Sequence, residues 1–266
     1  MAEYSVRRPA VAGQFYPDDP AVLRRAVRQY LDEARLPADL GPVRAVIAPH
    51  AGYIYSGPIA GFAFKALEGL PRKRWTVFLL GPSHRAYFSG VALGGYAAFR
   101  TPLGDVPVAQ ERVAELVARS PHYIRAPEAH RAEHCLEVEL PFLQVVLPEF
   151  QLVPMLFGEV APQAVGADLA EILGEDDLVV VSTDLSHYLP YSEAGRLDRA
   201  LLEALLAGDQ RAVGSGEACG RAPVVACMEL ARRLGWKSVL LDYRSSGDTA
   251  GDKWQVVGYA AVAYTA

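Results

Sequence analysis

The sequence predicts a single α/β domain whose parallel or mixed central sheet is covered by helices on both faces. Short apolar runs rich in β-branched residues alternate with longer amphipathic stretches, as is typical of strands joined by helices. Three of the runs end in a short loop that carries a histidine. With 51% hydrophobic and 21% charged residues, the 266-residue chain has the composition of an ordinary globular protein with a substantial core.

The elements of the first half follow from start signals and apolar spacing. Asp19-Pro20 is a helix start signal, and the apolar residues after it recur at helical spacing up to Ala34. Pro141 should begin or kink the helix in which it lies. The elements expected after the first helix are a strand at 43–48, a helix from about Pro58 to Leu70, a strand at 75–80, weaker strands at 90–95 and 106–108, and helices at 109–119 and 136–147.

The second half continues the alternation of strands and helices. Residues 150–157 are apolar enough for a buried strand despite Pro154. The elements expected after it are a helix at 163–173, a strand at 178–181, helices at 193–206 and 222–234, and strands at 238–243 and 256–264. The polar loop 245–252 is expected to be a long hairpin-type connection. Because no long linker, low-complexity segment or internal repeat is present, one domain spanning 1–266 is expected.

Charge and composition exclude several classes of protein. The net charge of −5 gives no basic footprint for nucleic acid or for an anionic membrane surface. The N-terminus lacks the apolar stretch of a signal peptide, and the apolar runs are shorter than the roughly 20 residues of a membrane helix. The three cysteines have no metal-finger spacing. A cytoplasmic protein that binds neither nucleic acid nor membrane is therefore expected.

Histidines follow three of the predicted strands. They are His50 after 43–48, His84 after 75–80, and His187 after 178–181. In an open α/β sheet ligands bind outside the carboxyl ends of the strands, and imidazole is both a common metal ligand and a proton carrier. The alternatives are a turn histidine bonded to backbone for His50 and an ordinary surface histidine for His84.

Asp184 and His187 are three residues apart, so on a turn or helix the carboxylate could orient the imidazole. His187 is then the preferred acid–base group. In the alternative interpretation Asp184 caps the following turn.

Residues 133–139 gather three glutamates, His134 and a cysteine. His134 and Glu137 would share a helix face, although a solvated face explains the glutamates equally well unless His134 lies near His50. His122 and His130 lie in polar, loop-like sequence and are expected to be exposed to solvent.

Cys219 lies just before a predicted helix and beside Arg221. A thiol in this position should have a lowered pKa, which suits a metal ligand or a nucleophile. Cys135 and Cys227 are expected to pack as small hydrophobic residues. Tyr53, in the glycine- and tyrosine-rich turn after His50, and Arg221 are the residues expected to contact a substrate.

These motifs resemble the Memo family, and most of the chain takes part. The matching stretches are residues 7–17, 48–53, 80–84, 133–134 with 140–141, 182–188, 219–221, and 246–248 with 257–259. The resemblance implies a fold related to the class III extradiol dioxygenases, which are non-haem iron enzymes. It also implies association with a radical-SAM protein and an AMMECR1-like protein, and a vertebrate relative binds phosphotyrosine-containing peptide.

The resemblance further implies roles for individual residues. His50, His84 and Cys219 fall on the family's pocket residues, for which iron or copper binding is reported. His187 falls on a catalytic histidine of the dioxygenases, and His134 resembles their second pocket histidine. Cys219 stands where those enzymes have a glutamate, and the softer thiol favours copper or a redox role.

Three functions remain open at this point. The first is a metal-dependent redox enzyme with an iron or copper ion and an unknown small-molecule substrate. The second is a non-catalytic module that receives a phosphorylated or acidic peptide in the same pocket, with Arg221 as the cation. The third is hydrolysis by a Cys219 nucleophile with His187 as the base.

Overall fold

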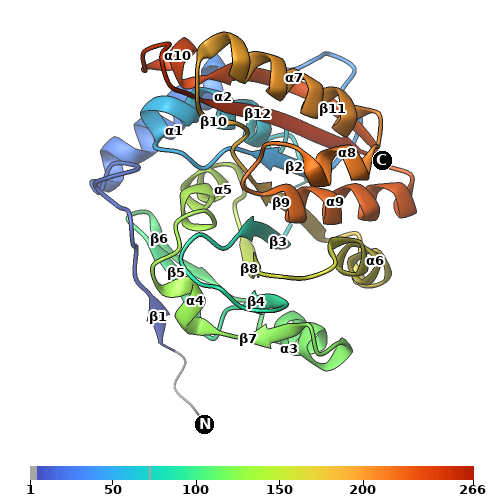
Figure 1. The fold of residues 1–266 in the computed structure, drawn as a ribbon. Coiled ribbons are helices and arrows are strands. Elements are labelled where there is room, and N and C mark those ends of the chain that lie inside the picture. Colours follow the sequence, from blue (N-terminus) through green and yellow to red (C-terminus); the bar gives the residue numbers. More distant parts are fainter. Residues whose placement is uncertain (1–4, 72) are drawn as a thin grey trace.

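The structure, a computed structural model, describes residues 5–71 and 73–266 (Figure 1). Nine strands of this part of the chain form a mixed sheet in the order β10, β12, β2, β9, β3, β8, β4 and β7, with β11 paired to β12. They are β2 (Val43–Ala48), β3 (Trp75–Pro82), β4 (Val91–Leu93), β7 (Tyr123–Arg125), β8 (Phe150–Phe157), β9 (Asp177–Ser182), β10 (His187–Leu189), β11 (Lys237–Ser245) and β12 (Val256–Thr265). A smaller sheet contains β1 (Val6–Arg7), β5 (Ala98–Thr101) and β6 (Gly104–Pro107).

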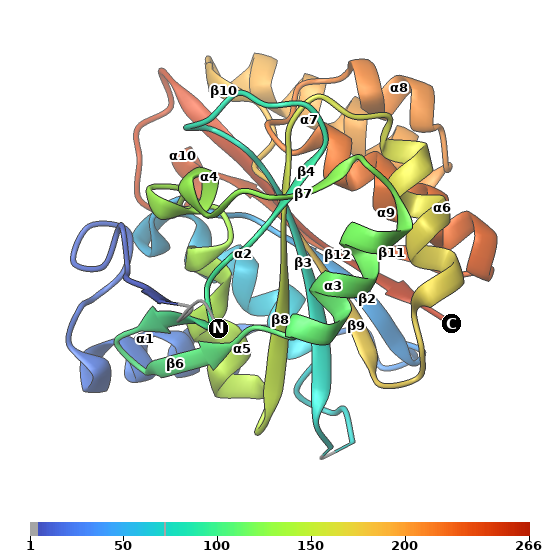
Figure 2. The same ribbon diagram turned by 90° about the horizontal axis from the view of Figure 1, so that it is seen from below.

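Helices cover both faces of the large sheet, and Figure 2 shows the two groups on either side of the strands. One group is α1 (Pro20–Glu33), α2 (Tyr53–Lys65) and α5 (Leu140–Val146). The other is α6 (Pro162–Ile172), α7 (Tyr191–Leu206), α8 (Gln210–Ser215) and α9 (Arg221–Leu234), with α3 (Gln110–Arg119) joined to α6 by an Arg119–Asp168 ion pair. The short helices are α4 (Pro127–Arg131) and α10 (Ser246–Thr249). The predicted α/β fold with a mixed central sheet is confirmed.

The centre of the sheet is parallel, which determines where a site can form. Strands β2, β9, β3 and β8 run in the same direction, and β3 and β9 are buried along their whole length. Burial on both faces explains why their sequences read as continuous apolar runs. The antiparallel strand β12 brings its first residues to the edge at which β2, β9 and β3 end. Loops from four strands therefore meet at one edge.

Two predicted helices begin at different residues in the structure. Helix α2 begins at Tyr53 rather than near Pro58, so the proline lies inside it and removes one backbone hydrogen bond. Eight of the 13 residues of this helix are buried. The stretch 136–147 divides into a 3₁₀ turn, Glu137–Glu139, followed by α5, in whose first turn Pro141 is tolerated.

The connection between the last two strands is the predicted hairpin. Strands β11 and β12 pair antiparallel, and the loop between them contains α10. The capping box of Ser245 and Asp248 holds this short helix, which faces the edge of the sheet where the strand-end loops meet.

Candidate metal centre

Three histidines meet at the carboxyl edge of the sheet. A ring nitrogen of each of His50, His84 and His134 lies within 4.8 Å of a ring nitrogen of the other two. The ring centroids are 5.2 Å apart for His50 and His84, 5.4 Å for His50 and His134, and 4.8 Å for His84 and His134. The first two histidines follow β2 and β3, and the third follows α4. This spacing allows three imidazoles to share one metal ion.

One nitrogen of each ring is already held by a protein oxygen. His50 Nδ1 lies 2.7 Å from Ser182 Oγ, and the Nδ1 atoms of His84 and His134 lie 2.9 Å and 3.1 Å from Glu133 Oε1. Metal-binding histidines are commonly oriented in this way, since the second nitrogen is bonded to an oxygen acceptor. The Nε2 atoms are therefore the ones available to a ligand.

Glu133 organises two of the three histidines. Besides the two rings, its Oε1 accepts the backbone N–H groups of His134 and Cys135, and its Oε2 accepts that of His84 at 2.6 Å. Burial raises the pKa of this carboxyl, but the hydrogen bonds from His134 and His84 outweigh burial and hold its pKa well below the usual range. A permanent negative charge therefore lies beneath the two imidazoles.

Burial also sets the protonation state of His50. Its side chain is buried, and both burial and the neighbouring rings of His134 and His84 lower its pKa well below the usual value. His50 is thus neutral at physiological pH, which is the form that can coordinate a metal.

Cys219 and Asp184 lie against His50. Cys219 Sγ is 3.4 Å from His50 Nε2 and accepts the backbone N–H of Asp184 at 3.3 Å. Asp184 Oδ1 accepts the backbone N–H of His50 at 2.8 Å, and Oδ2 is 4.0 Å from His50 Nε2. Burial raises the pKa of Asp184 to about 6 and that of Cys219 to about 12. The lowered pKa expected for Cys219 is wrong, because burial outweighs the hydrogen bonds that its sulfur accepts.

A cavity of about 620 Å³ opens above the histidines. His50, His84, His134, Asp184 and His187 all line it. The other lining residues are Phe15, Ala51, Gly52, Tyr55, Arg85, Tyr188, Ser246, Gly251, Asp252, Gln255, Val257 and Tyr259. The site thus combines a cluster of nitrogen donors with a chamber large enough for a small molecule.

Comparison with known proteins places the chain in a family. The family model described as "Memo-like protein" matches residues 7–263. The chain belongs to the Memo family. It is 38% identical to a MEMO1 family protein of Methanopyrus kandleri, covering 97% of this chain and 98% of that protein, and 39% identical to one of Methanothermobacter thermautotrophicus, covering 96% and 99%.

A solved structure shares the fold at low sequence identity. An uncharacterized protein from Escherichia coli K12 superposes with a TM-score of 0.54 at 12% identity, covering 82% of this chain and 99% of that one. Within the described part of this Memo family member, no helix has the length and apolar character needed to span a membrane.

The structure separates some residues that the sequence predicted to act together. The carboxylate of Asp184 bonds to His50, and none of its hydrogen bonds within the described part of the chain goes to His187. Among the described residues Asp184 also caps no helix, because strand β10 begins at His187. The imidazole nearest to the Cys219 thiol is that of His50 rather than His187.

The two residues expected to contact a substrate lie outside the cavity walls. Tyr53 is buried and donates its hydroxyl hydrogen to Val138 O at 2.7 Å, while Tyr55 lines the cavity. Arg221 donates to Gly216 O, and the arginine at the cavity is Arg85. Arg85 directly follows His84 in the sequence, which was a signal that could have identified it.

Two exposure predictions for the segment 130–139 are wrong, and His122, also expected to be exposed, is partly buried. His130 is only 1% exposed, and its Nε2 lies 3.0 Å from Ala92 O. Glu133, Glu137 and Glu139 are all buried, so they do not form a solvated helix face. Their carboxylates instead accept hydrogen bonds inside the protein, as Glu133 does from His84 and Glu139 from Ser182.

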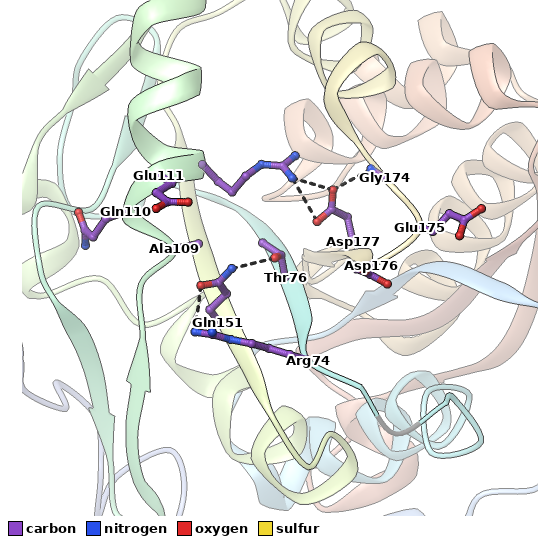
Figure 3. A pocket seen from close by; sticks show the side chains of 11 residues that line it. Arg74, Thr76, Ala109, Gln110, Glu111, Gln151, Gly174, Glu175, Asp176 and Asp177 are labelled. Atoms are coloured by element: carbon purple, nitrogen blue, oxygen red, sulfur yellow. Dashed lines mark hydrogen bonds and ion pairs between the residues drawn. The ribbon is translucent and has the colours of Figure 1, made fainter.

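A second hollow lies at the opposite edge of the sheet, near the first residues of β3, β8 and β9 (Figure 3). Its volume is about 740 Å³, and its polar groups largely bond to one another. Arg112 pairs with Asp177 at 3.1 Å, and Gln151 donates to Thr76. Since none of the described residues that line this hollow is a histidine or a cysteine, it lacks the donors found at the carboxyl edge.

Proposed function

We propose that this Memo family member is a metal-dependent redox protein that binds one iron or copper ion through His50, His84 and His134. The convergence of three imidazoles whose Nδ1 atoms are already held carries this proposal. Imidazole suits both iron and copper. A bound ion of this kind would supply Lewis-acid and one-electron chemistry at the floor of the cavity.

Cys219 is proposed as a further donor to the same ion. Two donors that share a tetrahedral ion, with bonds of about 2.1 Å to nitrogen and 2.3 Å to sulfur, lie about 3.6 Å apart. The 3.4 Å between Cys219 Sγ and His50 Nε2 is close to that separation, but no set of three donors within 4.8 Å of one another among the described residues includes Cys219, so its side chain would have to move to join the ion. A thiolate in the ligand set would favour copper, whereas a set of three imidazoles leaves both metals open.

His187 is proposed to move a proton between a substrate and solvent. Its side chain lines the cavity and is exposed, so it can exchange protons with water. Asp184 supports the floor of the site by accepting the backbone N–H of His50, which fixes the loop after β2. Arg85 offers a cation at the cavity for an acidic group of the substrate.

Metal analysis tests the proposal. Protein purified without a metal-chelating tag should contain about one iron or copper ion per chain, and stripped protein should bind one equivalent of either ion on titration. Alanine variants of His50, His84 and His134 should each lower the affinity, whereas His122→Ala, a histidine outside the cavity, should not. Full metal occupancy in the His50→Ala, His134→Ala double variant would refute the proposed site.

The same cavity could instead serve a non-catalytic peptide-binding protein, with Arg85 in the role expected of Arg221. Calorimetry with a phosphorylated peptide and its unphosphorylated form separates the two functions. Preference for the phosphorylated form that is lost in Arg85→Ala, in metal-free protein, would favour peptide binding.

A further inference from the structure

Arg7, in the first strand, holds the backbone of the segment that supplies Glu133 and His134. The side chain of Arg7 is buried, and it reaches a segment that lies more than 120 residues further along the chain. Its Nε donates to His130 O at 2.7 Å, and its Nη2 donates to Glu133 O. The two carbonyls bracket the turn that follows α4. Arg7 therefore fixes the backbone from which the Glu133 carboxylate reaches His84 and His134.

Glu137 is the partner of Arg7 and holds a second segment. Its Oε2 accepts Arg7 Nη1 at 2.6 Å and the backbone N–H of Ala10 at 2.7 Å. Its Oε1 accepts the backbone N–H of Val11 at 3.0 Å and the hydroxyl of Tyr16 at 2.6 Å. The carboxylate thus fixes the turn at residues 10–16 by both of its ends.

The two segments meet at His134. Phe15, within the turn that Glu137 holds, packs edge-on against the His134 ring with centroids 5.0 Å apart. The backbone carbonyl of Phe15 also accepts the N–H of Tyr53 at 2.7 Å, which attaches the turn to the beginning of α2. His134 is therefore oriented at Nδ1 by Glu133 and packed on its ring by Phe15.

We propose that the buried Arg7–Glu137 pair is the positioning element of the metal centre, and that it acts by fixing His134 as a ligand. This inference rests on the proposed metal site. Replacing a buried, paired arginine by lysine removes the planar fork that serves several acceptors at once, even though the charge is kept. Changes in groups that orient metal ligands typically weaken metal affinity by about 10-fold to 100-fold.

The test compares Arg7→Lys and Glu137→Gln with Arg112→Lys, which alters the ion pair with Asp177 at the opposite edge of the sheet. Stripped protein is titrated with Co²⁺, and its visible spectrum reports the ligand geometry. Arg7→Lys and Glu137→Gln should weaken Co²⁺ binding by about 10-fold or more and shift its spectrum towards that of His134→Ala. Arg112→Lys should leave both unchanged.

A double-mutant cycle separates positioning from general loss of stability. In the His134→Ala background, Arg7→Lys should cause no further loss of Co²⁺ affinity, because the ligand through which it acts is gone. An equal loss in both backgrounds, or no loss in either, would overturn the inference.

A metal-free measurement distinguishes this inference from the metal site itself. Ring-nitrogen NMR signals of ¹⁵N-labelled histidine should move for His134 in Arg7→Lys and stay in place for His122. If wild-type protein bound no Co²⁺, the metal site would fail while these signals still reported the positioning. Unchanged His134 signals in both Arg7→Lys and Glu137→Gln would overturn the positioning role.

Discussion

Replacing Glu133 by glutamine should disable the histidine cluster, whereas the same replacement of Glu139 should be tolerated. Both residues are buried, but they differ in the number of donors around them. Glu133 accepts four hydrogen bonds, from three backbone N–H groups and the His84 ring, and the ring of His134 lies 3.1 Å from the same carboxylate. Within the described part of the chain, Glu139 bonds only to the Ser182 hydroxyl, at 2.8 Å, and its Oε2 has no partner.

The magnitudes follow from this difference. The amide introduced by Glu133→Gln would keep most contacts with its oxygen in the place of Oε1 and its NH₂ group in the place of Oε2. The NH₂ group would then face the backbone N–H of His84, whose nitrogen lies 2.6 Å from the present Oε2, so two donors would meet. Losing a hydrogen bond to a charged group and leaving a buried donor unsatisfied should together cost about 2–4 kcal/mol of unfolding free energy. Metal affinity should fall by about 10-fold to 100-fold. Below about pH 4.3, where the Glu139 carboxyl is protonated in the folded and the unfolded chain, Glu139→Gln should cost less than about 1 kcal/mol, because an amide resembles a protonated carboxyl group in shape and charge.

The two variants should also differ in their dependence on pH. Because the pKa of Glu133 is lowered in the folded state, its stabilisation is present above the unfolded pKa of about 4.3 and is lost as pH falls further. Burial raises the pKa of Glu139 well above its usual value, so its contribution is present below about pH 4.3 and is lost as pH rises. Glu139→Gln should therefore gain stability relative to wild type above that pH, by up to about 1.4 kcal/mol per pH unit.

Urea denaturation of metal-free protein between pH 3.5 and pH 8 measures both effects. The difference in unfolding free energy between wild type and Glu133→Gln should shrink as the pH falls towards 3.5. As the pH rises towards 8, Glu139→Gln should become increasingly more stable than wild type. Equal losses of stability and of metal affinity in the two variants would refute the assigned charges.

Three further predictions concern single residues. In folded, metal-free protein at pH 8, iodoacetamide should modify Cys219 far more slowly than a cysteine of the unfolded chain, because burial raises the pKa of its thiol to about 12. Mass spectrometry measures the labelling rate, and rapid labelling would contradict the prediction. Arg221→Ala should leave metal affinity within about twofold of wild type in a competition titration, since the residue lies outside the cavity; a larger loss would place it in the site. Gly258→Ala should lower the unfolding free energy by about 1–3 kcal/mol in urea denaturation, because the added Cβ would lie 2.0 Å from Asp198 Oδ2. Gly69→Ala, with open space around it, should cause no such loss, and equal effects of the two changes would contradict the packing argument.

The positions of His50 and His84 were predictable because they depend on local signals. Each follows an apolar strand directly, and parallel strands bring their carboxyl ends to one edge. The position of His134 was not predictable in the same way. Its place depends on how the segment after α4 folds back, which long-range contacts from Arg7 determine. Sequence patterns therefore identified the donor residues, but only packing showed which of them meet.

The positions of the two expected substrate contacts, Tyr53 and Arg221, outside the cavity lining have a different physical origin. Tyr53 and Tyr55 are two residues apart at the beginning of α2, so the helix turns their side chains to different sides. Because α2 was expected to begin near Pro58, both tyrosines were assigned to a loop, and the sequence could not predict which of them faces the cavity. Arg221 is the first residue of α9, donates to Gly216 O and is not among the residues that line the cavity, although Cys219, two residues before it, contacts His50.

The acidic groups around the histidines differ in how readily they ionise, because burial, hydrogen-bond donors and the kind of acid all contribute. Glu133 has enough donors to stay ionised despite burial. Asp184, with one backbone donor from His50, has a pKa near 6, and Cys219 has one near 12. Because nearby positive charge lowers the pKa of an acid, a divalent ion in the cluster would favour ionisation of Asp184 and Cys219 beside it. The site therefore combines a Glu133 carboxylate that stays ionised with a Cys219 thiol that is neutral by itself and whose ionisation would depend on the charge of the occupant.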